Sequence, residues 1–394
     1  MAQHVSARRT WPLRRRLTAA ALALGTVGAL AAAAPPGSGE SPRRTDHGFR
    51  ERDLVSDIPG RAEATDGNLV NPWGLAAART GEVWASDNGT DKATMYSGAV
   101  RRKPVNILDL VVSIPEGGAP TGIVRNDTDD FRFSGFGRSG VAEFLFAGED
   151  GDLFAWSPGV NLTNAVRVAH ENSDGENAVF KGLTLISAKK KDSGAYAQRG
   201  KTAGHGKRSQ LLVANFRDAR IDVFDKDFNL LPTDDRFQDP NIPDGFAPFD
   251  VKKIGSRVFV TYAKQDEDKK DDVPGAGNGF IDTFSTEGKL LKRFASRGVL
   301  NSPWGLEIAP KKFGKFSGDL LVGNFGDGHI NVFNPNSGKF KGTLRDRKGN
   351  AIEIPGLWGL LRGTNKSGGK DSVWFAAGID DEAHGLLGTL RAED

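Results

Sequence analysis

The sequence predicts an all-β protein, a six-bladed β-propeller of four-stranded antiparallel blades, and three observations lead to that prediction. Glycine is abundant, with 50 residues in a chain of 394. Short apolar runs recur along the chain and end in Gly, Asp, Asn or Pro, which is typical of strands separated by turns. The third observation is a repeated unit. It decides the architecture, because a single four-stranded sheet cannot bury both of its faces alone.

The repeated unit is clearest between Asn301 and Phe333. An inner strand with small residues, SPWGLEIA, comes first, and an apolar strand, LLVGN, follows after a turn. A tight Gly/Asp hairpin then leads into an alternating strand, HINVF. The unit therefore predicts the inner, second and third strands of one blade.

Six copies of this unit align along the chain. The inner strands begin with NPWGL at 71–75, TGIV at 121–124, KGLTL at 181–185, APFDV at 247–251, SPWGL at 302–306 and GLWGL at 356–360. The second strands end in a polar turn, as VWASDN at 83–88, FLFAGED at 144–150, LLVAN at 211–215, VFVTYAKQ at 258–265, LLVGN at 320–324 and VWFAAGID at 373–380. Six such sheets around one axis make a six-bladed propeller.

The last copy of the unit runs out after its third strand, LLGTL at 386–390. The segment from Asp53 to Ser56 precedes the first inner strand. We expect this N-terminal segment to supply the missing outer strand and so to close the ring. The propeller domain would then occupy residues 49–394 as a monomer.

The first 34 residues have the layout of a secretory signal peptide. Arginines between Arg8 and Arg16 precede an uncharged run, rich in Ala and Leu, from Leu17 to Ala34. A basic region, an apolar region and small residues before a cleavage point define such signals, although the length of the run also allows an uncleaved anchor. We expect cleavage at residue 34, a disordered tether over 35–48, a secreted protein and no membrane span in the mature chain.

Composition excludes several kinds of site. The chain has no cysteine, which rules out disulfides, thiolate metal sites and a cysteine nucleophile. The formal net charge of +3 is close to balance and gives no support to nucleic-acid binding. The sequence contains no Gly-x-Ser-x-Gly elbow and no His-Glu-x-x-His motif.

Several phrases of the sequence resemble known propellers. LLVANFRDARIDVFDKD and LLVGNFGDGHINVFNPNSG are similar to the NHL-type repeat. From Asp53 to Leu390 the chain resembles a family of exported bacterial proteins of unknown function, through DGNLVNPWGLA, IPDGFAPFDV, SPWGLEIAP, FGKFSGDLLVGNFGDG and GLWGL. The resemblance implies a propeller of about six blades and an extracellular location, and it implies no activity. Metal-dependent lactonases and virginiamycin-type lyases are also propellers, which is an analogy of fold only.

Polar residues should gather at one end of the ring. The first and second strands of a blade are antiparallel, so the start of the first and the end of the second lie at the same end of the axis. Lys181 aside, these positions carry oxygen-bearing side chains: Asn71, Thr121, Asp250, Ser302, Asp87, Asn88, Glu149, Asp150, Asn215, Gln265, Asn324, Asp380 and Asp381. We expect them to surround one mouth of the channel.

A divalent cation, calcium first, is one interpretation of this mouth, because hard cations take about six to eight oxygen ligands. The candidate ligands are Asp87, Glu149, Asn215, Asp250 and Asn324. Turn chemistry is the alternative interpretation. Asp and Asn at a strand end before Gly are favoured hairpin residues, whose side chains bond to nearby backbone N–H groups.

Other residues of the mouth are candidates for ligand binding: Asn71, Trp73, Asn88, Gln265, Trp304 and Trp358. Each of the three tryptophans precedes Gly-Leu, so their rings could form a platform for a sugar. Alternatively they wedge between blades, where glycine permits close approach. Gln265 begins a charged loop that ends at Gly277. This loop should project over the mouth as a lid, a cation-binding flap or a plain solvated loop.

Three functional classes follow from these residues. The first is an exported binding module whose channel face holds a small molecule, a glycan or a protein. The second is a metal-dependent hydrolase or lyase that acts on a small molecule such as a lactone, with Glu149 or Asp250 as the base. The third is a structural envelope or matrix protein. His384 is a further acid–base candidate, because it follows an acidic run in the last hairpin.

Overall fold

The computed structural model describes residues 48–393, apart from Glu116, Asp174 and 188–208. The expected signal peptide and all of the expected tether except its last residue lie outside this part of the chain. Among the described residues, no helix combines the length and the apolar character needed to cross a bilayer.

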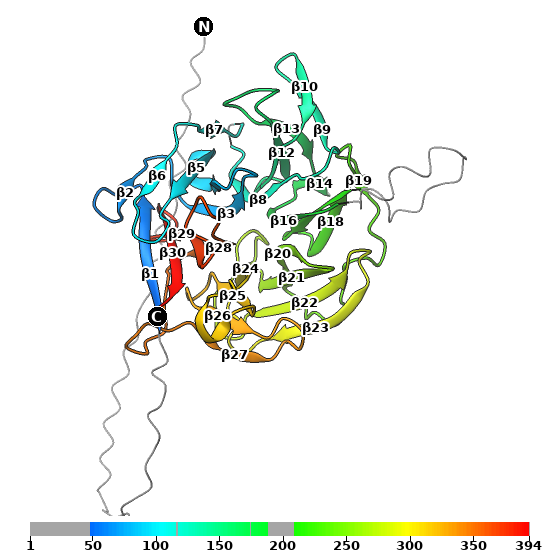
Figure 1. The fold of residues 1–394 in the computed structure, drawn as a ribbon. Coiled ribbons are helices and arrows are strands. Elements are labelled where there is room, and N and C mark those ends of the chain that lie inside the picture. Colours follow the sequence, from blue (N-terminus) through cyan, green and yellow to red (C-terminus); the bar gives the residue numbers. More distant parts are fainter. Residues whose placement is uncertain (1–47, 116, 174, 188–208, 394) are drawn as a thin grey trace, which may run out of the picture. The chain divides into compact units, whose positions relative to one another are not determined.

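Six sheets surround one axis and follow one another in sequence order (Figure 1). The first blade contains β3 (Pro72–Ala77), β4 (Val83–Asp87), β5 (Lys92–Gly98) and β6 (Val105–Ile107), and β7 (Val112–Ser113) also pairs with β5. The second contains β8 (Pro120–Arg125), β11 (Phe144–Gly148), β12 (Asp152–Trp156) and β13 (Val166–His170). The third contains β16 (Phe180–Ile186), β17 (Gln210–Asn215), β18 (Arg220–Phe224) and β19 (Leu230–Leu231).

The remaining blades repeat this order. The fourth contains β20 (Phe246–Ile254), β21 (Arg257–Lys264), β22 (Gly279–Ser285) and β23 (Leu290–Ser296). The fifth contains β24 (Pro303–Ile308), β25 (Leu320–Asn324), β26 (Ile330–Phe333) and β27 (Phe340–Thr343). The sixth contains β28 (Leu357–Arg362), β29 (Ser372–Ile379), β30 (His384–Ala392) and β1 (Phe49–Ser56), with β2 (Ala64–Thr65) at its edge.

Two small hairpins and two 3-10 turns complete the described elements. The hairpins are β9 (Arg132–Gly135) with β10 (Arg138–Val141), and β14 (Asn172–Ser173) with β15 (Glu176–Asn177). The turns are η1 (Asn88–Thr90) and η3 (Gly314–Phe316).

The N-terminal strand closes the ring. β1 pairs antiparallel with β30, with Phe49 opposite Ala392 and Ser56 opposite Leu386. The outer strand of the sixth blade, β1, therefore comes from the N-terminal part of the sequence, whereas β28, β29 and β30 come from the C-terminal part. This confirms both the six-bladed prediction and the predicted closure by the segment around Asp53–Ser56.

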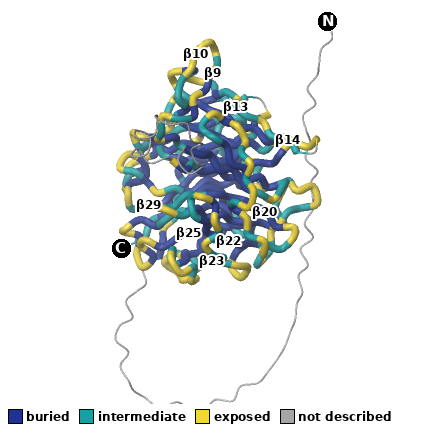
Figure 2. The backbone as a smooth tube through the Cα atoms, turned by 90° about the vertical axis from the view of Figure 1, so that its right-hand side faces the viewer, coloured by how far each residue is buried: buried dark blue, intermediate teal, exposed yellow. Residues whose placement is uncertain are grey.

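The second strands are mainly apolar and mostly buried, with polar residues near their ends. All eight residues of β29 are buried, as are all five of β11. Neighbouring blades cover both faces of each sheet, and the interior of the domain is mostly buried (Figure 2). Trp84 of the first blade and Phe144 of the second pack there with ring centroids 4.6 Å apart.

Glycine allows the inner strands to approach closely around the axis. In five blades the inner strand carries glycine at one equivalent position: Gly74, Gly122, Gly182, Gly305 and Gly359. A Cβ atom on Gly305 would lie 2.5 Å from the carbonyl oxygen of Trp358, and one on Gly359 would lie 2.5 Å from that of Trp73. In the fourth blade the equivalent residue is Asp250. Its Oδ1 lies 1.8 Å from where a Cβ on Gly182 would be.

The residues that precede this glycine ring fill the axis with aromatic rings. Trp73 and Trp358 stack with centroids 3.6 Å apart, and Trp304 meets Trp358 edge-on at 5.6 Å. All three are at most 4% exposed. The three tryptophans therefore pack against one another on the axis, next to the close approach of the inner strands at the following glycines.

Candidate functional site

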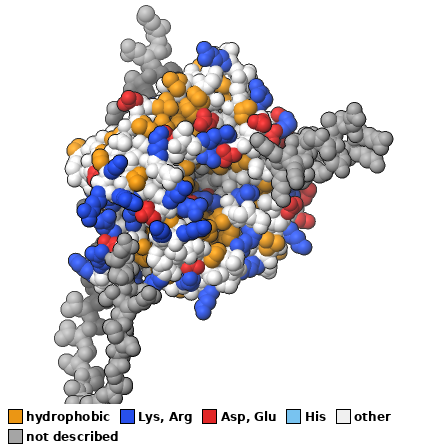
Figure 3. All heavy atoms as spheres, in the orientation of Figure 1, with side chains coloured by type: hydrophobic (Ala, Val, Ile, Leu, Met, Phe, Trp, Pro, Cys, Tyr) orange, Lys and Arg blue, Asp and Glu red, His pale blue; other side chains and the backbone are white. Residues whose placement is uncertain are grey.

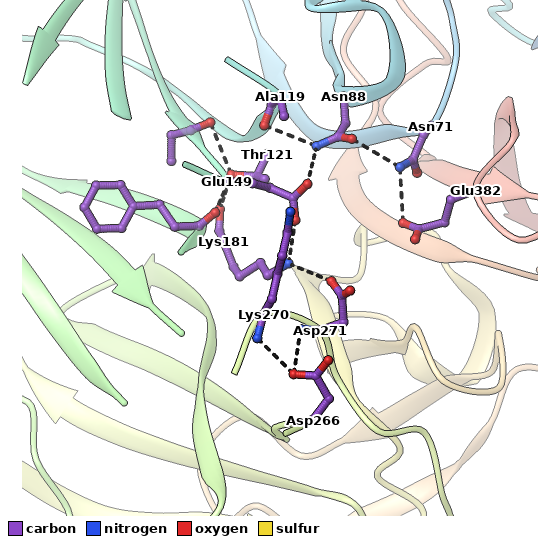
Figure 4. Close-up of polar contacts among 12 residues, drawn as sticks. Asn71, Asn88, Ala119, Thr121, Glu149, Lys181, Asp266, Lys270, Asp271 and Glu382 are labelled. Atoms are coloured by element: carbon purple, nitrogen blue, oxygen red, sulfur yellow. Dashed lines mark hydrogen bonds and ion pairs between the residues drawn. The ribbon is translucent and has the colours of Figure 1, made fainter. Parts of the chain in front are cut away.

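Lys181 lies at the centre of the polar mouth. It belongs to β16, and its side chain is only 1% exposed. Its Nζ lies 2.7 Å from Oε1 of Glu149 and 3.7 Å from Oδ1 of Asp271 (Figure 4). The ammonium group also lies 4.8 Å from the centroid of the Trp73 ring. Side chains from the first four blades thus converge on one buried cation.

The charges of this cluster stabilise one another. Burial alone would lower the pKa of Lys181, but Glu149 and Asp271 outweigh it, so the pKa lies above its ordinary value. For Glu149 the opposing effects of burial and of the Lys181 ammonium leave its pKa below the ordinary value. Lys181 is therefore a fixed positive charge, not a nucleophilic amine, and Glu149 is a carboxylate at neutral pH.

Two asparagines connect Glu149 to a second carboxyl group. Asn88 Nδ2 donates to Glu149 Oε2 at 3.3 Å, and Asn71 Nδ2 approaches Asn88 Oδ1 at 3.4 Å. Asn71 Nδ2 also donates to Glu382 Oε1 at 3.2 Å. The indole N–H of Trp358 donates to Asn71 Oδ1 at 3.2 Å, which orients the amide. These five residues and Lys181, all labelled in Figure 4 except Trp358, form the core of what we call the Lys181 cluster, which also includes Asp271.

Glu382 differs from Glu149 in its protonation. Burial raises the pKa of Glu382 to about 7, and repulsion from Glu149 adds to this effect. The cluster therefore holds an ionised carboxylate and a carboxyl group that exchanges its proton near neutrality. Two carboxyl groups separated in this way can serve as proton acceptor and proton donor.

The backbone at Glu382 and Asn71 adopts an unfavourable conformation. Asp380, Asp381 and Glu382 have φ angles of 55°, 54° and 67°, three consecutive non-glycine residues in the left-handed region. Asn71 has φ 46°. Such residues cost free energy and concentrate at functional sites, where the surrounding structure maintains them.

The loop that begins at Gln265 is a closed turn beside the cluster. Asp266 N–H donates to the Asp271 carbonyl at 2.8 Å, and Lys270 N–H donates to Asp266 Oδ1 at 2.9 Å. Gln265 Nε2 donates to the Phe216 carbonyl at 2.6 Å, which ties the loop to the third blade. These bonds hold Asp271 beside Lys181. The position of this loop agrees with the expectation that it reaches the mouth.

A polar cavity of about 330 Å³ adjoins Glu149. It is lined by Glu149, Asp150, Gly175, Glu176, Asn177, Ala178, Val179, Arg217 and Lys270. Two of these lining residues bond to each other, since Arg217 Nη1 donates to Glu176 Oε2 at 2.9 Å. We call this cavity the mouth groove. Its lining of carboxylates, an amide and two cations suits a hydrophilic ligand.

Two indole N–H groups of the mouth lack an acceptor within the described protein. Trp73 and Trp304 are 3% and 4% exposed, and neither Nε1 atom has a hydrogen-bond partner there. Buried donors are nearly always paired with protein or with ordered water. These two N–H groups are therefore buried donors without an acceptor among the described residues.

Three of the predicted cation ligands form hydrogen bonds of a structural kind. Asp87 is fully buried and accepts from Thr94 Oγ1 at 2.8 Å, and burial raises its pKa well above the ordinary range. Asn215 Nδ2 donates to Asp222 at 2.8 Å, and Asn324 Nδ2 donates to the Val299 carbonyl at 2.8 Å. These contacts resemble the turn and strand chemistry that was the alternative interpretation.

The other two predicted ligands lie apart from each other. Glu149 belongs to the Lys181 cluster, whereas Asp250 borders a second cavity on the axis. Within the described ranges, no group of three or more His, Cys, Asp or Glu side chains is arranged to hold a metal ion. The cation site stays a prediction from the sequence.

His384 pairs with an acid outside the cluster. Its Nδ1 lies 2.7 Å from Oδ2 of Asp57, and Gly385 N–H donates to the other carboxylate oxygen at 2.8 Å. The side chain of His384 is 42% exposed. Among the described residues, no contact connects His384 with the Lys181 cluster, so the structure does not indicate an acid–base role for His384.

Sequence reasoning identified part of the cluster and missed its centre. Asn71, Asn88 and Glu149 were expected at this mouth. Lys181 was set aside as the one basic residue among oxygen-bearing positions, although a single cation in such a ring was itself the signal. Asp271 and Glu382 were missed because loop conformations place them there.

Comparison with known proteins identifies relatives without a described activity. Uncharacterized protein R648 of Acanthamoeba polyphaga mimivirus is 31% identical over 353 residues, which cover 89% of this chain and 82% of that protein. Uncharacterized protein L690 of the same virus is 31% identical over 356 residues, 89% of this chain and 87% of that protein. These relatives are viral, whereas the sequence resemblance predicted bacterial ones. No family model matches the chain.

Solved structures share the fold at low identity. The α-L-arabinanase of Penicillium chrysogenum, solved with arabinobiose, aligns with a TM-score of 0.50 and 14% identity, over 87% of this chain and 98% of that one. Virginiamycin B lyase from Staphylococcus aureus aligns with a TM-score of 0.46 and 12% identity, over 87% of this chain and 99% of that one. At these identities the likeness extends to the propeller fold alone.

Proposed function

The chain belongs to the family that includes uncharacterized proteins R648 and L690 of Acanthamoeba polyphaga mimivirus, and since no activity is known from these relatives, we propose its function from the site. The protein is a binding module that holds a small hydrophilic ligand, a saccharide, in the mouth groove against the Lys181 cluster. The observation that carries this proposal is the buried ammonium of Lys181, surrounded by carboxyl and amide groups from several blades at one mouth of the channel.

The energetics of the cluster support a role in binding. Removing two charges from water costs several kcal/mol per ion, and apolar residues of similar size are often as stabilising as a buried ion pair. The left-handed backbone at Asn71 and Glu382 adds a further cost. A fold gains little stability from such an arrangement, so a pre-organised recognition site accounts for it better than packing does.

The mouth groove indicates the class of ligand. Its volume of about 330 Å³ is at the small end of ligand pockets, which span about 300–1,000 Å³. Glu149, Asp150 and Glu176 accept hydrogen bonds from hydroxyl groups, and Lys270 donates to ring or hydroxyl oxygens. A sugar unit presents both kinds of group, whereas an apolar ligand would leave these side chains unpaired.

Export of the protein is part of the same proposal. It rests on the basic, apolar and small-residue order of the first 34 residues.

A glycan array followed by calorimetry on the best saccharide tests the proposal. Glu149→Gln should weaken binding about tenfold or more, because a charge-assisted acceptor and its Lys181 contact are lost. Glu267→Gln is the matched control, since Glu267 is an exposed acid of the adjacent loop. No saccharide binding, or equal affinity in Glu149→Gln, would rule the proposal out.

Catalysis at the same mouth is a second candidate. It is favoured by the ionised Glu149, which Asn88 and Asn71 connect to Glu382, whose pKa burial raises to about 7. A hydrolase would use Glu382 as proton donor. Glu382→Gln would then abolish turnover of the array's best saccharide but leave its affinity within about threefold. Unchanged turnover in that variant would eliminate this candidate.

The predicted divalent cation is tested separately by mass spectrometry of the purified protein and by melting with and without chelator. One ion per chain and a chelator-sensitive melt would support a calcium-dependent hydrolase or lyase. Absence of a chelator effect and of bound metal would remove that class.

A further inference from the structure

A second cavity, of about 290 Å³, lies on the axis among the inner strands of all six blades. The inner strands begin at the mouth, and this cavity is lined by the glycine ring and by the residues that follow it. It therefore opens at the other end of the channel from the Lys181 cluster. Figure 3 views one end of the ring and shows a hollow at its middle with Lys and Arg side chains around it. We call this cavity the axial cavity.

Asp250 is the acidic group deepest in the axial cavity. Five blades have glycine at its position, so its carboxylate is the one side-chain charge at that level of the channel. The residue is 6% exposed, and its backbone N–H donates to Thr261 Oγ1 at 2.9 Å. Among the described residues, no side chain donates a hydrogen bond to the carboxylate. Burial raises the pKa of Asp250 and outweighs the charge of Lys252 and the backbone N–H of Val251, which stabilise the carboxylate. A ligand cation or a proton would offset the remaining cost of burying this group.

The opposite charge lies two residues further along the same strand. Lys252 Nζ lies 3.7 Å from Glu307 Oε2 and donates to the Leu360 carbonyl at 3.3 Å. The Lys252 side chain is 30% exposed. Glu307 also accepts from the backbone N–H groups of Ile308 and Arg362, at 2.9 and 3.2 Å. Its charge is therefore shared among three donors, which leaves Lys252 able to bind a further anion.

Arg125 adds a second cation at this level of the cavity. Its Nη1 donates to the Ala77 carbonyl at 2.8 Å. Its side chain is 26% exposed, and Asp127 accepts from it at 2.6 Å. The axial cavity thus has one carboxyl group at depth and two cations at its rim, each paired with an acid, Lys252 with Glu307 and Arg125 with Asp127.

Apolar residues line the cavity between Asp250 and the charges at the rim. They occupy one position of each inner strand, immediately after the glycine ring: Leu75, Ile123, Leu183, Val251, Leu306 and Leu360. Each is at most 8% exposed, because its side chain packs mainly into a core between blades. An aliphatic spacer can pack against this apolar band, while charged groups at its two ends meet opposite charges.

We propose that the axial cavity binds a small zwitterion, with its ammonium group on Asp250 and its carboxylate on Lys252. A simple anion would pair with Lys252 but not with Asp250, and a simple cation would pair with Asp250 but not with Lys252. A molecule with both charges pairs with both groups. This site is distinct from the saccharide site, because it lies beyond the glycine ring and shares no residue with the Lys181 cluster.

Calorimetry on the full chain tests this proposal with three probes that have six carbon atoms each. 6-Aminohexanoate carries both charges, whereas hexylamine and hexanoate carry one each. We expect 6-aminohexanoate to bind at least about tenfold more tightly than either single-charge probe. L-Leucine, titrated in parallel, provides a zwitterion with a shorter distance between its charges.

Variants locate the binding. Asp250→Asn should remove the preference for 6-aminohexanoate over hexanoate, and Lys252→Gln should remove the preference over hexylamine. Asp250→Gly, which restores the residue of the other five blades, guards against misfolding as the cause of lost binding. Asp129→Asn and Lys370→Gln change exposed charges outside the cavity lining and should bind as the unmodified protein does.

Two results would overturn the proposal. One is that neither 6-aminohexanoate nor L-leucine binds at millimolar concentration. The other is that folded Asp250→Asn and Asp250→Gly bind 6-aminohexanoate with unchanged affinity. Neither result would bear on the saccharide proposal, whose variants lie at the other mouth.

Discussion

At the scale of the residue, Lys181 organises the mouth. Its ammonium is 1% exposed and retains its charge because Glu149 and Asp271 lie within 4 Å. A buried pair of this kind is sensitive to the loss of one partner, because the other charge remains buried without compensation. The cost of losing Lys181 alone therefore exceeds the net stability that the pair contributes.

The first prediction concerns Lys181→Met. We expect a loss of about 3–5 kcal/mol in the free energy of unfolding, measured with urea, because Glu149 is left uncompensated. Adding Glu149→Leu should recover most of that loss, since the double variant buries no charge there. A single-variant loss below about 0.5 kcal/mol would mean that the pair is solvated and not a buried site.

Protonation of buried carboxyl groups makes stability depend on pH. Burial raises the pKa of Glu382 and of Asp250 to about 7 and that of Asp272 to about 6. In the unfolded chain these groups release their protons near pH 4. The folded chain therefore holds more protons between about pH 4 and 7, so their contribution to stability is complete below that window and is lost as pH rises through 6 to 7.

The second prediction follows from this sign. The melting temperature should fall as the pH rises from 5 to 8. The free energy of unfolding should fall over the same range, and Glu382→Gln should make this loss of free energy smaller by about 1–2 kcal/mol. Glu267→Gln, at an exposed position, should leave the pH profile unchanged. A melting temperature that rises over this range would contradict the assignment.

At the scale of the element, glycine determines how the inner strands meet. The ring from Gly74 to Gly359 lets backbones approach at distances that exclude any Cβ atom. Asp250 departs from this rule, and its carboxylate occupies space left by Gly182. One substitution in a repeat therefore creates a charge in the channel without widening the ring.

The third prediction is that Gly359→Ala destabilises the ring by about 2–3 kcal/mol, because its Cβ would meet the Trp73 carbonyl, a backbone atom that cannot move aside. Gly67→Ala is the control, since a Cβ there meets no atom within 4 Å. Thermal unfolding of both variants measures the difference. Equal stability would show that the inner strands can separate without cost.

At the scale of the whole molecule, β1 joins the two ends of the described chain in one sheet. Its pairing with β30 covers the edge of the sixth blade along Phe49–Ser56. Without it, the ring would carry an exposed strand edge and an incomplete core. Closure therefore contributes to the stability of every blade, because each depends on two neighbours.

The fourth prediction is that a chain lacking residues up to Ser56 loses cooperative unfolding and aggregates at concentrations where the full domain is soluble. A chain lacking residues up to 46 is the control and should melt as the full chain does. Size-exclusion chromatography with a melting scan distinguishes them. A cooperative, monomeric Ser56 truncation would show that β1 is dispensable.

The repeat made the fold predictable, because all six inner and second strands were marked by apolar runs with polar ends. The closing strand was predictable by elimination, since the last unit lacked an outer strand. The site was predictable only in part. Asn71 and Glu149 follow from antiparallel strand directions, but Glu382 reaches the mouth through three left-handed residues. Its sequence, Asp-Asp-Glu, contains no glycine to indicate that conformation.

The most direct measurement for the central claim is a crystal structure of the protein soaked with the saccharide that binds best on the array. We predict density in the mouth groove, with sugar hydroxyl groups within hydrogen-bond distance of Glu149 and Lys270. Density for the saccharide at the axial cavity or on an outer blade surface, with the mouth groove unchanged, would contradict the account.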